Sequence, residues 1–319
     1  MKPTERIKEF GSWTLFFVIF GLAPIVDSSE YHLMLATHIL IWGMFAVAFN
    51  MLFGVTGMLS FGQALYYGIG AYTVGLMVKN VGASWFLPSV VLGLIVTIIL
   101  AILLGLLVIR VSGVYFTVLT LAFGQLAWQV ALKWYHFTGG DDGIQSIMPP
   151  GLLGNNRVYY WFTLALVALS ILVLKRLVNS PLGLTLRCIR QNPERIRFLG
   201  RRVRRNQLRV YVISSFFAAL AGALMAGADN SIHPDMLYWT TSGEVILMAV
   251  IGGIGQFFGP FVGAAVIIII QDYVGARTEY WSLIIGLVMM TMVIALPRGL
   301  VGEIRSAGMR LLSAERSRG

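Results

Sequence analysis

The stretch FLPSVVLGLIVTIILAILLGLLVI, residues 86–109, indicates the fold class, because it runs for 24 residues without a charged side chain. A helix needs roughly 20 predominantly apolar residues to cross the hydrocarbon core of a bilayer. The whole chain has the same character: of its 319 residues, 57% are hydrophobic and 12% are charged. A soluble core of this size cannot bury so many apolar residues, so we expect an all-α, polytopic membrane protein.

Nine further apolar segments accompany this stretch and make ten candidate membrane spans. The segment 12–26 is short for a full crossing, so a tilted or interfacial helix stays open there. No small-x-small cleavage pattern follows it, and we interpret it as an uncleaved first span rather than a signal sequence. The ten candidates lie near residues 12–26, 33–53, 60–78, 86–109, 114–132, 158–174, 208–228, 244–257, 259–271 and 281–297.

The distribution of basic residues gives the orientation. If the spans alternate from a cytoplasmic N-terminus, 20 of the 24 Lys and Arg residues lie on the cytoplasmic side, as the positive-inside rule requires. The segment 244–271 is either one helix of 28 residues or two short helices. A single crossing there would place the basic C-terminal tail outside, so we expect two crossings or a re-entrant pair.

We therefore expect about ten transmembrane helices, some of them short or broken, with both termini in the cytoplasm. The lipid bilayer is the solvent of this architecture. The expected regions are a cytoplasmic N-tail (1–11), spans one to six (12–174), a cytoplasmic loop (175–207), spans seven to ten (208–297) and a cytoplasmic C-tail (298–319).

The loop between spans six and seven contains a structured segment, SPLGLTLRCIRQNPERIRFLG, which we call the elbow (residues 180–200). Ser180 and Asn192 are each followed by a proline, as at the start of a helix, and Gly200 ends the second helix. Ile196, Phe198 and Leu199 are expected to supply apolar contacts of that helix. The elbow either anchors to anionic lipid or inserts into a groove of a soluble partner and transmits its movements.

A second segment, GVTGMLSFGQALYYGIGAY (54–72), interrupts an apolar region with glycines and hydroxyl residues. Irregular backbone at membrane depth is tolerated where it is buried in protein or lines a wet cavity. The segment is therefore a candidate for the lining of a transport pathway. A tight turn with packing glycines is the alternative.

A third segment, TGGDDGI (138–144), lies on the expected outer side and is rich in turn formers and acids. We interpret it as a docking surface for a protein, with a plain turn as the alternative. The glutamate that an EF-hand requires is missing, so a calcium loop is not expected.

Several classes of function are not expected from this sequence. It contains no phosphate-binding loop, no His-Glu-x-x-His and no Gly-x-Ser-x-Gly motif, so we expect neither an ATPase nor an enzyme. The four histidines lack ligand spacing and are interpreted as loop or helix-end residues, and the single Cys188 excludes a cysteine-rich metal site. The net charge of +10 comes mostly from loops and tails, so no nucleic acid partner is expected.

The acidic residues also argue against a proton-driven carrier, since Glu244 and Asp272 fall at predicted span ends rather than deep within spans. A transporter of this kind needs a separate source of energy. From about residue 35 to 305 the chain resembles the LivM-type permeases of branched-chain amino acid ABC importers. The resemblance rests on the three segments above together with GVYFTVLTLAFGQ (113–125), SSFFAALAGAL (214–224) and GGIGQFFGPFVGA (252–264).

The resemblance implies a permease in the bacterial inner membrane that works with other subunits. Its expected partners are a second related permease, two cytoplasmic ATP-binding subunits that carry ATP and Mg, and a periplasmic solute-binding protein. No cofactor is expected in this chain. Whether the two permeases are identical stays open.

The site residues follow from the resemblance and from the three segments. By resemblance, the positions that contact the ATPase are Arg187, Arg190, Asn192, Pro193, Glu194, Arg197 and Gly200. The candidates for lining the pathway are Phe61, Gly62, Gln63, Tyr66, Tyr67 and Gln125. The candidates for docking the binding protein are Thr138, Gly139, Gly140 and Asp142.

The solute stays open within a class. The family that the chain resembles also includes permeases for urea, short amides and aromatic acids, so we expect a branched-chain amino acid or a related small polar solute. A self-sufficient channel or facilitator is the alternative function, and a membrane-bound enzyme ranks third. The run Arg201-Arg202-Val203-Arg204-Arg205 is more basic than the family pattern, which leaves added lipid contacts open.

Overall fold

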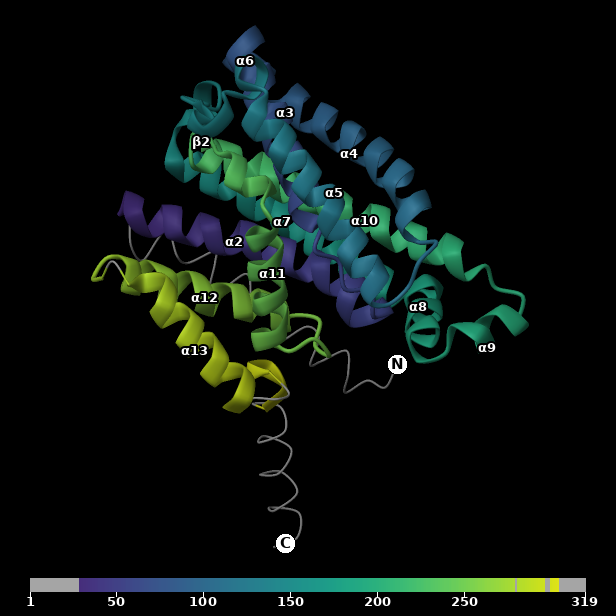
Figure 1. Ribbon diagram of the computed structural model, residues 1–319. Coiled ribbons are helices and arrows are strands. Elements are labelled where there is room, and N and C mark those ends of the chain that lie inside the picture. Colours follow the sequence, from purple (N-terminus) through teal and green to yellow (C-terminus); the bar gives the residue numbers. More distant parts are fainter. Residues whose placement is uncertain (1–28, 279, 296–298, 304–319) are drawn as a thin grey trace, which may run out of the picture.

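The computed structural model describes residues 29–278, 280–295 and 299–303 of the chain. The predicted N-tail and first span, together with residues 296–298 and 304–319, lie outside the described residues. Within the described part the chain forms a bundle of helices (Figure 1). The prediction of an all-α protein is confirmed for these residues.

Six long helices make up most of the bundle, and shorter helices complete it. The long helices are α2 (Glu30–Asn50), α3 (Gln63–Val81), α4 (Phe86–Val108), α5 (Val114–Lys133), α7 (Asn156–Val178) and α10 (Val203–Ala228). The shorter ones are α6 (Tyr135–Thr138), α8 (Pro181–Gln191), α9 (Pro193–Phe198), α11 (Trp239–Gly252), α12 (Gly259–Gly275) and α13 (Trp281–Ala295). Single turns are η1 (Met51–Val55), η2 (Ala83–Trp85), η3 (Gly140–Asp142), η4 (Gly151–Gly154) and η5 (Pro234–Leu237).

Nine of the ten predicted apolar segments coincide with helices, and the tenth, 12–26, is outside the described residues. Five described segments are long and apolar enough to cross a membrane: Glu30–Val55, Ala83–Val108, Val114–Lys133, Asn156–Val178 and Val203–Ala228. Helix α11 has 14 residues, about 21 Å at roughly 1.5 Å per residue, which is short of a hydrocarbon core of about 30 Å.

The segment 244–271 divides into two helices, because α11 ends at Gly252 and α12 begins at Gly259. The alternative of one 28-residue helix is therefore wrong. Glycines let the two helices approach closely: a Cβ atom on Gly263 would overlap the carbonyl oxygen of Met248, and one on Gly252 would overlap that of Gly259. Close approach of this kind is how small residues hold membrane helices together.

Helices α3 and α10 pack together at the centre of the bundle, with α2, α4 and α7 around α10. Of the 18 most apolar consecutive residues of each segment, 83% are buried in α10, against 28% in Ala83–Val108 and 22% in α5. The central position of α10 follows from its small residues, since a Cβ atom on Gly222 would overlap the carbonyl oxygen of Tyr67. Ala218, Gly222 and Ala226, spaced four residues apart on one face of α10, are all buried.

Helix α4 lies at the periphery and exposes an apolar face. Exposed apolar side chains recur every three or four residues along the helix, which is the spacing of one helix face, and together they form a stripe. Such a face suits acyl chains rather than water. Its exposed members are Leu92, Ile95, Ile99, Leu103 and Leu106.

We predict that Gly222→Ala destabilises the bundle, because the added methyl group meets backbone that cannot move aside. Overpacking of this kind costs about 1–3 kcal/mol, and the midpoint of thermal unfolding in detergent measures it. Gly286→Ala is the matched control, since a Cβ atom at Gly286 would have nothing within 4 Å. Equal midpoints for the two variants would contradict the close α3–α10 crossing.

Candidate functional site

The backbone is broken between α2 and α3, as predicted for the segment 54–72. Helix α2 continues into the π-helical turn η1, residues 57–60 have no helical structure, and α3 begins only at Gln63. Gly57 has a φ of 76°, a left-handed conformation that glycine adopts without strain. The alternative interpretation, a tight turn with packing glycines, also holds in part. Gly62 is such a packing glycine, because a Cβ atom on it would lie 2.6 Å from the carbonyl oxygen of Thr120.

Hydroxyl groups of α5 and α11 bind the backbone of this break. The amide of Phe61 donates to Thr120 Oγ1 at 3.2 Å, and Thr117 Oγ1 donates to the carbonyl oxygen of Leu59 at 2.9 Å. The amide of Ala64, in the first turn of α3, donates to Ser242 Oγ at 2.8 Å. The break is therefore fixed by side chains from two other helices.

The predicted pathway residues divide into two groups. Tyr66 and Tyr67 are in the core, with exposed fractions of 0% and 1%. The hydroxyl of Tyr66 is 3.0 Å from that of Tyr211 on α10, and the ring of Tyr67 stacks on Phe45 with centroids 5.1 Å apart. These two tyrosines hold α3 against its neighbours.

The other group lies at the start of α3 and on the facing side of α5. Gln63 is buried and its Oε1 accepts a hydrogen bond from Ser214 Oγ at 3.4 Å. The side-chain N–H groups of Gln63, Gln125 and Trp128 are enclosed and have no acceptor among the described residues. Gly124 of α5 packs near the Cα atom of Gly62. Gln63 and Gln125 are the next residues after these two glycines, so both lie beside the same backbone contact. The sequence prediction missed Trp128, one turn after Gln125.

The elbow has the two helices that its capping residues predict. Ser180 Oγ accepts from the amide of Gly183 at 3.4 Å, and Asn192 Oδ1 accepts from the amide of Arg195 at 3.0 Å. Gly200 has a φ of 74°, which suits the end of a helix. Both helix starts and the glycine stop are confirmed.

The tip of the elbow exposes large apolar side chains. Of the residues expected to make apolar contacts, only Ile196 is buried. Phe198 and Leu199 are 89% and 72% exposed, so that prediction is wrong for both. Helix α9 is so short that the chain turns away at Gly200 before these side chains meet another helix.

Most predicted coupling residues lie on the outside of the elbow, where Asn192, Pro193, Glu194, Arg197 and Gly200 are exposed. Arg197 Nη1 donates to Glu194 Oε1 at 2.5 Å. Arg187 and Arg190 are exposed as well, but Arg190 Nη1 also donates to the carbonyl oxygen of Gly54 in η1. The elbow is thereby bound to the break after α2.

A cavity of about 590 Å³ lies between the elbow, η1 and the α11–α12 connection. Arg187 and Arg190 line it together with Asn50, Gly54 and Gln256. Asn50 is 5% exposed, and its Nδ2 donates to the carbonyl oxygen of Gln256 at 3.2 Å. The cavity thus joins the elbow to both interrupted helical segments. Asn50 and Gln256 were not predicted as site residues, although each is an amide beside a break.

The predicted docking loop is a series of tight turns after α5. Thr138 Oγ1 donates to the carbonyl oxygen of Ala131 at 2.5 Å, and Gly139 and Gly140 both have positive φ. Tyr135 donates to Asp142 Oδ2 at 3.0 Å, and this hydrogen bond raises the pKa of the tyrosine hydroxyl. The two-residue strands β1 (Ile144–Gln145) and β2 (Ser231–Ile232) then join the loop to the end of α10.

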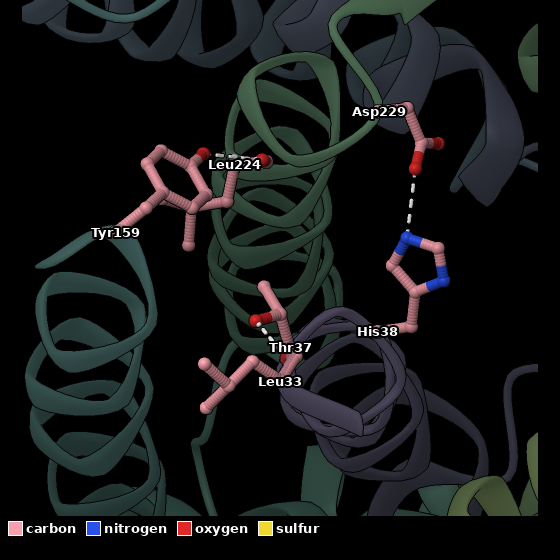
Figure 2. Close-up of polar contacts among 6 residues, drawn as sticks. All are labelled: Leu33, Thr37, His38, Tyr159, Leu224 and Asp229. Carbon is pink, nitrogen blue, oxygen red and sulfur yellow. Dashed lines mark hydrogen bonds and ion pairs between the residues drawn. The ribbon is translucent and has the colours of Figure 1, made fainter. Parts of the chain in front are cut away.

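One polar pair was not predicted at all. His38 Nε2 on α2 lies 2.7 Å from Asp229 Oδ1 at the end of α10 (Figure 2). The interpretation of His38 as a loop or helix-end residue is wrong, because it lies inside α2. A cavity of about 140 Å³ lined by Asp229, Thr37 and Tyr159 adjoins the pair. The two partners are 191 positions apart in sequence, which no local pattern reveals.

Comparison with known proteins identifies a family. The family described as "Branched-chain amino acid transport system / permease component" matches residues 31–293. The chain is 29% identical over 298 residues to the high-affinity branched-chain amino acid transport system permease protein LivM of Escherichia coli strain K12, with 85% of this chain and 70% of the relative covered. No solved structure matches the chain.

Two further relatives extend the comparison. The probable branched-chain amino acid transport permease protein LivM of Methanocaldococcus jannaschii is 27% identical over 282 residues, which cover 74% of this chain and 80% of the relative. The LivH permease protein of Salmonella typhimurium is 22% identical over 290 residues, with 82% and 91% covered. The chain is therefore a multi-pass membrane protein that belongs to the permease components of branched-chain amino acid transport systems, of the LivM type.

Proposed function

We propose that this chain is the permease subunit of an ABC importer in the bacterial inner membrane. It carries a branched-chain amino acid or a related small polar solute, and ATP is hydrolysed on separate subunits. The observation that carries the proposal is the elbow, which presents an exposed apolar tip on one side and binds the broken α2–α3 segment on the other.

The exposed tip fits a groove on a soluble ATPase. Phe198 and Leu199 together present a large apolar surface next to the charged side chains of Glu194 and Arg197. Amphipathic helices dock into partner proteins with this combination of apolar anchors and a polar rim. Movement of the ATPase then displaces the elbow as a unit, since its helices are short, capped and packed against η1 and α10.

The contact between Arg190 and Gly54 carries that movement to the break. Residues 57–60 belong to neither helix, so a small displacement of η1 can reorient the start of α3 at lower cost than bending an intact helix. Broken helices at membrane depth provide the binding sites of many transporters. We assign the pathway to this region, with Phe61 and Gly62 as its backbone.

Polar groups for the solute come from unpaired donors beside the break. An enclosed N–H group without an acceptor costs about 1–3 kcal/mol, so its retention favours a functional role. Gln63 and Gln125 each supply such a donor, which suits a solute with a carboxylate or carbonyl oxygen. Tyr66 and Tyr67 support this site by holding α3 in place.

The two ends of α10 lie next to the two segments that we assign to partner proteins. This helix has 26 residues, about 39 Å at roughly 1.5 Å per residue, which exceeds a hydrocarbon core of about 30 Å. The elbow precedes it and the β1–β2 connection to the docking loop follows it. We assign the elbow to one of the two ATP-binding subunits, which carry ATP and Mg, and the loop with Thr138, Gly139, Gly140 and Asp142 to a periplasmic binding protein.

A second permease completes the proposed complex. Relatives of this chain bear the names of two permease proteins, LivM and LivH, and we infer a related subunit beside this one. The proposed topology keeps about ten crossings with both termini in the cytoplasm. Helices α11 and α12 then form the short pair that either crosses twice or re-enters.

The coupling role predicts that Phe198→Ser combined with Leu199→Ser weakens association with the ATPase at least about tenfold, because each buried large apolar side chain contributes roughly 1.5–3 kcal/mol. Co-purification of the complex measures the effect. Leu152→Ser is the control, since Leu152 is 83% exposed but lies in η4, before α7. Undiminished co-purification, or solute flux through the reconstituted chain alone, would favour a channel instead.

The pathway assignment predicts that Gln125→Leu lowers solute uptake roughly tenfold while ATPase association is unchanged, because one hydrogen bond to a charged solute contributes about 1.5–3 kcal/mol. Gln129→Leu on the next turn of α5 is the matched control, because Gln129 is exposed. Uptake assays in proteoliposomes that contain the complete transporter compare the two. Equal uptake by both variants would remove Gln125 from the pathway.

The topology predicts opposite labelling of Asp141→Cys and Arg195→Cys in a Cys188→Ser background. A membrane-impermeant thiol reagent added to intact cells after outer-membrane permeabilisation is expected to modify the first variant only. Both positions are exposed, so access within the protein does not limit the reaction. Modification of both from the same side would overturn the proposed orientation.

A further inference from the structure

A second positively charged cavity lies outside the elbow and outside the proposed pathway. It has a volume of about 330 Å³ and is formed where the C-terminal end of α4 meets the N-terminal part of α10. Cavities of roughly 300–1,000 Å³ are typical of small-molecule sites. Its lining consists of Gly105, Leu106, Ile109, Arg110, Arg204, Arg205 and Leu208.

Close packing of the two helices brings the basic residues together. A Cβ atom on Gly105 would lie 2.6 Å from Leu208 Cδ1, so α4 and α10 are in direct contact one turn from the arginines. Arg110 follows α4, while Arg204 and Arg205 lie in the first turn of α10. Three arginines from the ends of two helices therefore line one cavity.

These charges lack a counter-ion within the described part of the chain. No carboxylate lines the cavity, and none of the three arginines forms an ion pair with a described residue. Arg110 donates through Nε to the carbonyl oxygen of Leu106 at 3.2 Å, which leaves its other N–H groups available. Clustered like charges repel one another unless an anion lies between them, and guanidinium groups suit phosphate oxygens in particular.

Apolar residues also line the cavity and continue onto the exposed stripe of α4. Leu106 lines the cavity and is also the last member of the exposed stripe on α4. An occupant with a phosphate group and attached acyl chains satisfies both features: its head lies among the arginines and its chains lie along Leu103 and Ile99. A free anion would satisfy only the first.

We propose that this cavity, with Arg110, Arg204 and Arg205, binds the headgroup of an anionic phospholipid. Basic pockets between transmembrane helices are a recurrent way of holding such headgroups. The site is separate from the elbow tip and from the α2–α3 break, so it stands independently of the proposed transport function.

Native mass spectrometry of the full-length chain tests the proposal, with phosphatidylglycerol as the probe and phosphatidylcholine of the same acyl chains as the neutral comparison. Arg204→Gln combined with Arg205→Gln is expected to weaken phosphatidylglycerol binding roughly 10- to 30-fold, since each arginine near a lipid phosphate contributes about fivefold. Binding of phosphatidylcholine is expected to stay unchanged.

Arg201→Gln combined with Arg202→Gln is the matched control, because it removes the same charge from exposed positions that do not line the cavity. Arg204→Lys combined with Arg205→Lys retains the charge but not the guanidinium groups, and is expected to bind phosphatidylglycerol more tightly than the glutamine pair and less tightly than the unchanged chain. The thermal midpoint of each variant checks that it is folded.

Three results would overturn the proposal. Equal weakening by the cavity pair and the control pair would mean that only the general basic charge attracts the lipid. Displacement of phosphatidylglycerol by excess inorganic phosphate would identify a free-anion site. Loss of ATPase co-purification with unchanged lipid binding would assign the arginines to an acidic protein surface.

Discussion

The structure depends on how the backbone satisfies its hydrogen bonds where α2 gives way to α3. In a bilayer no water is available to pair an exposed N–H or C=O group, so irregular backbone survives only with partners from the protein. Thr117, Thr120 and Ser242 supply these partners from α5 and α11, and Arg190 supplies one more from the elbow. The positions of three other elements are therefore tied to one interruption.

Glycine packing allows this arrangement to close. Helix α10 can approach α3 only because Gly222 and Gly70 have no side chain, since a Cβ atom at either would overlap backbone of the other helix. The close crossing brings Ser214 of α10 to Gln63 at the start of α3. The same helix joins the elbow at one end to the docking loop at the other, and so connects the two surfaces assigned to partner proteins.

Basic, acidic and apolar side chains lie on different surfaces of the molecule. Guanidinium groups gather at the elbow and at the α4–α10 cavity, while the loop at the opposite end of α10 carries the acids Asp141 and Asp142. Between them α4 presents aliphatic side chains. Two polar ends and an apolar middle are what a chain that crosses a lipid bilayer requires.

The amino-acid sequence by itself determined the features that depend on near neighbours. Apolar segments predicted nine of the described helices, because burial in lipid acts on each segment separately. The caps Ser180 and Asn192 and the stop at Gly200 were predicted because capping involves residues within one turn. The break near Gly57 followed from its local glycines and hydroxyl groups.

Only the tertiary structure decided which distant groups meet. Arg190 pairs with Gly54 across 136 positions and His38 with Asp229 across 191, and neither pair has a signature in the sequence between its partners. The outward direction of Phe198 depends on where the chain turns after α9. The burial of Tyr66 and the enclosure of Gln125 depend on how α3, α5 and α10 pack, and such packing is a property of the assembled helices rather than of any one segment.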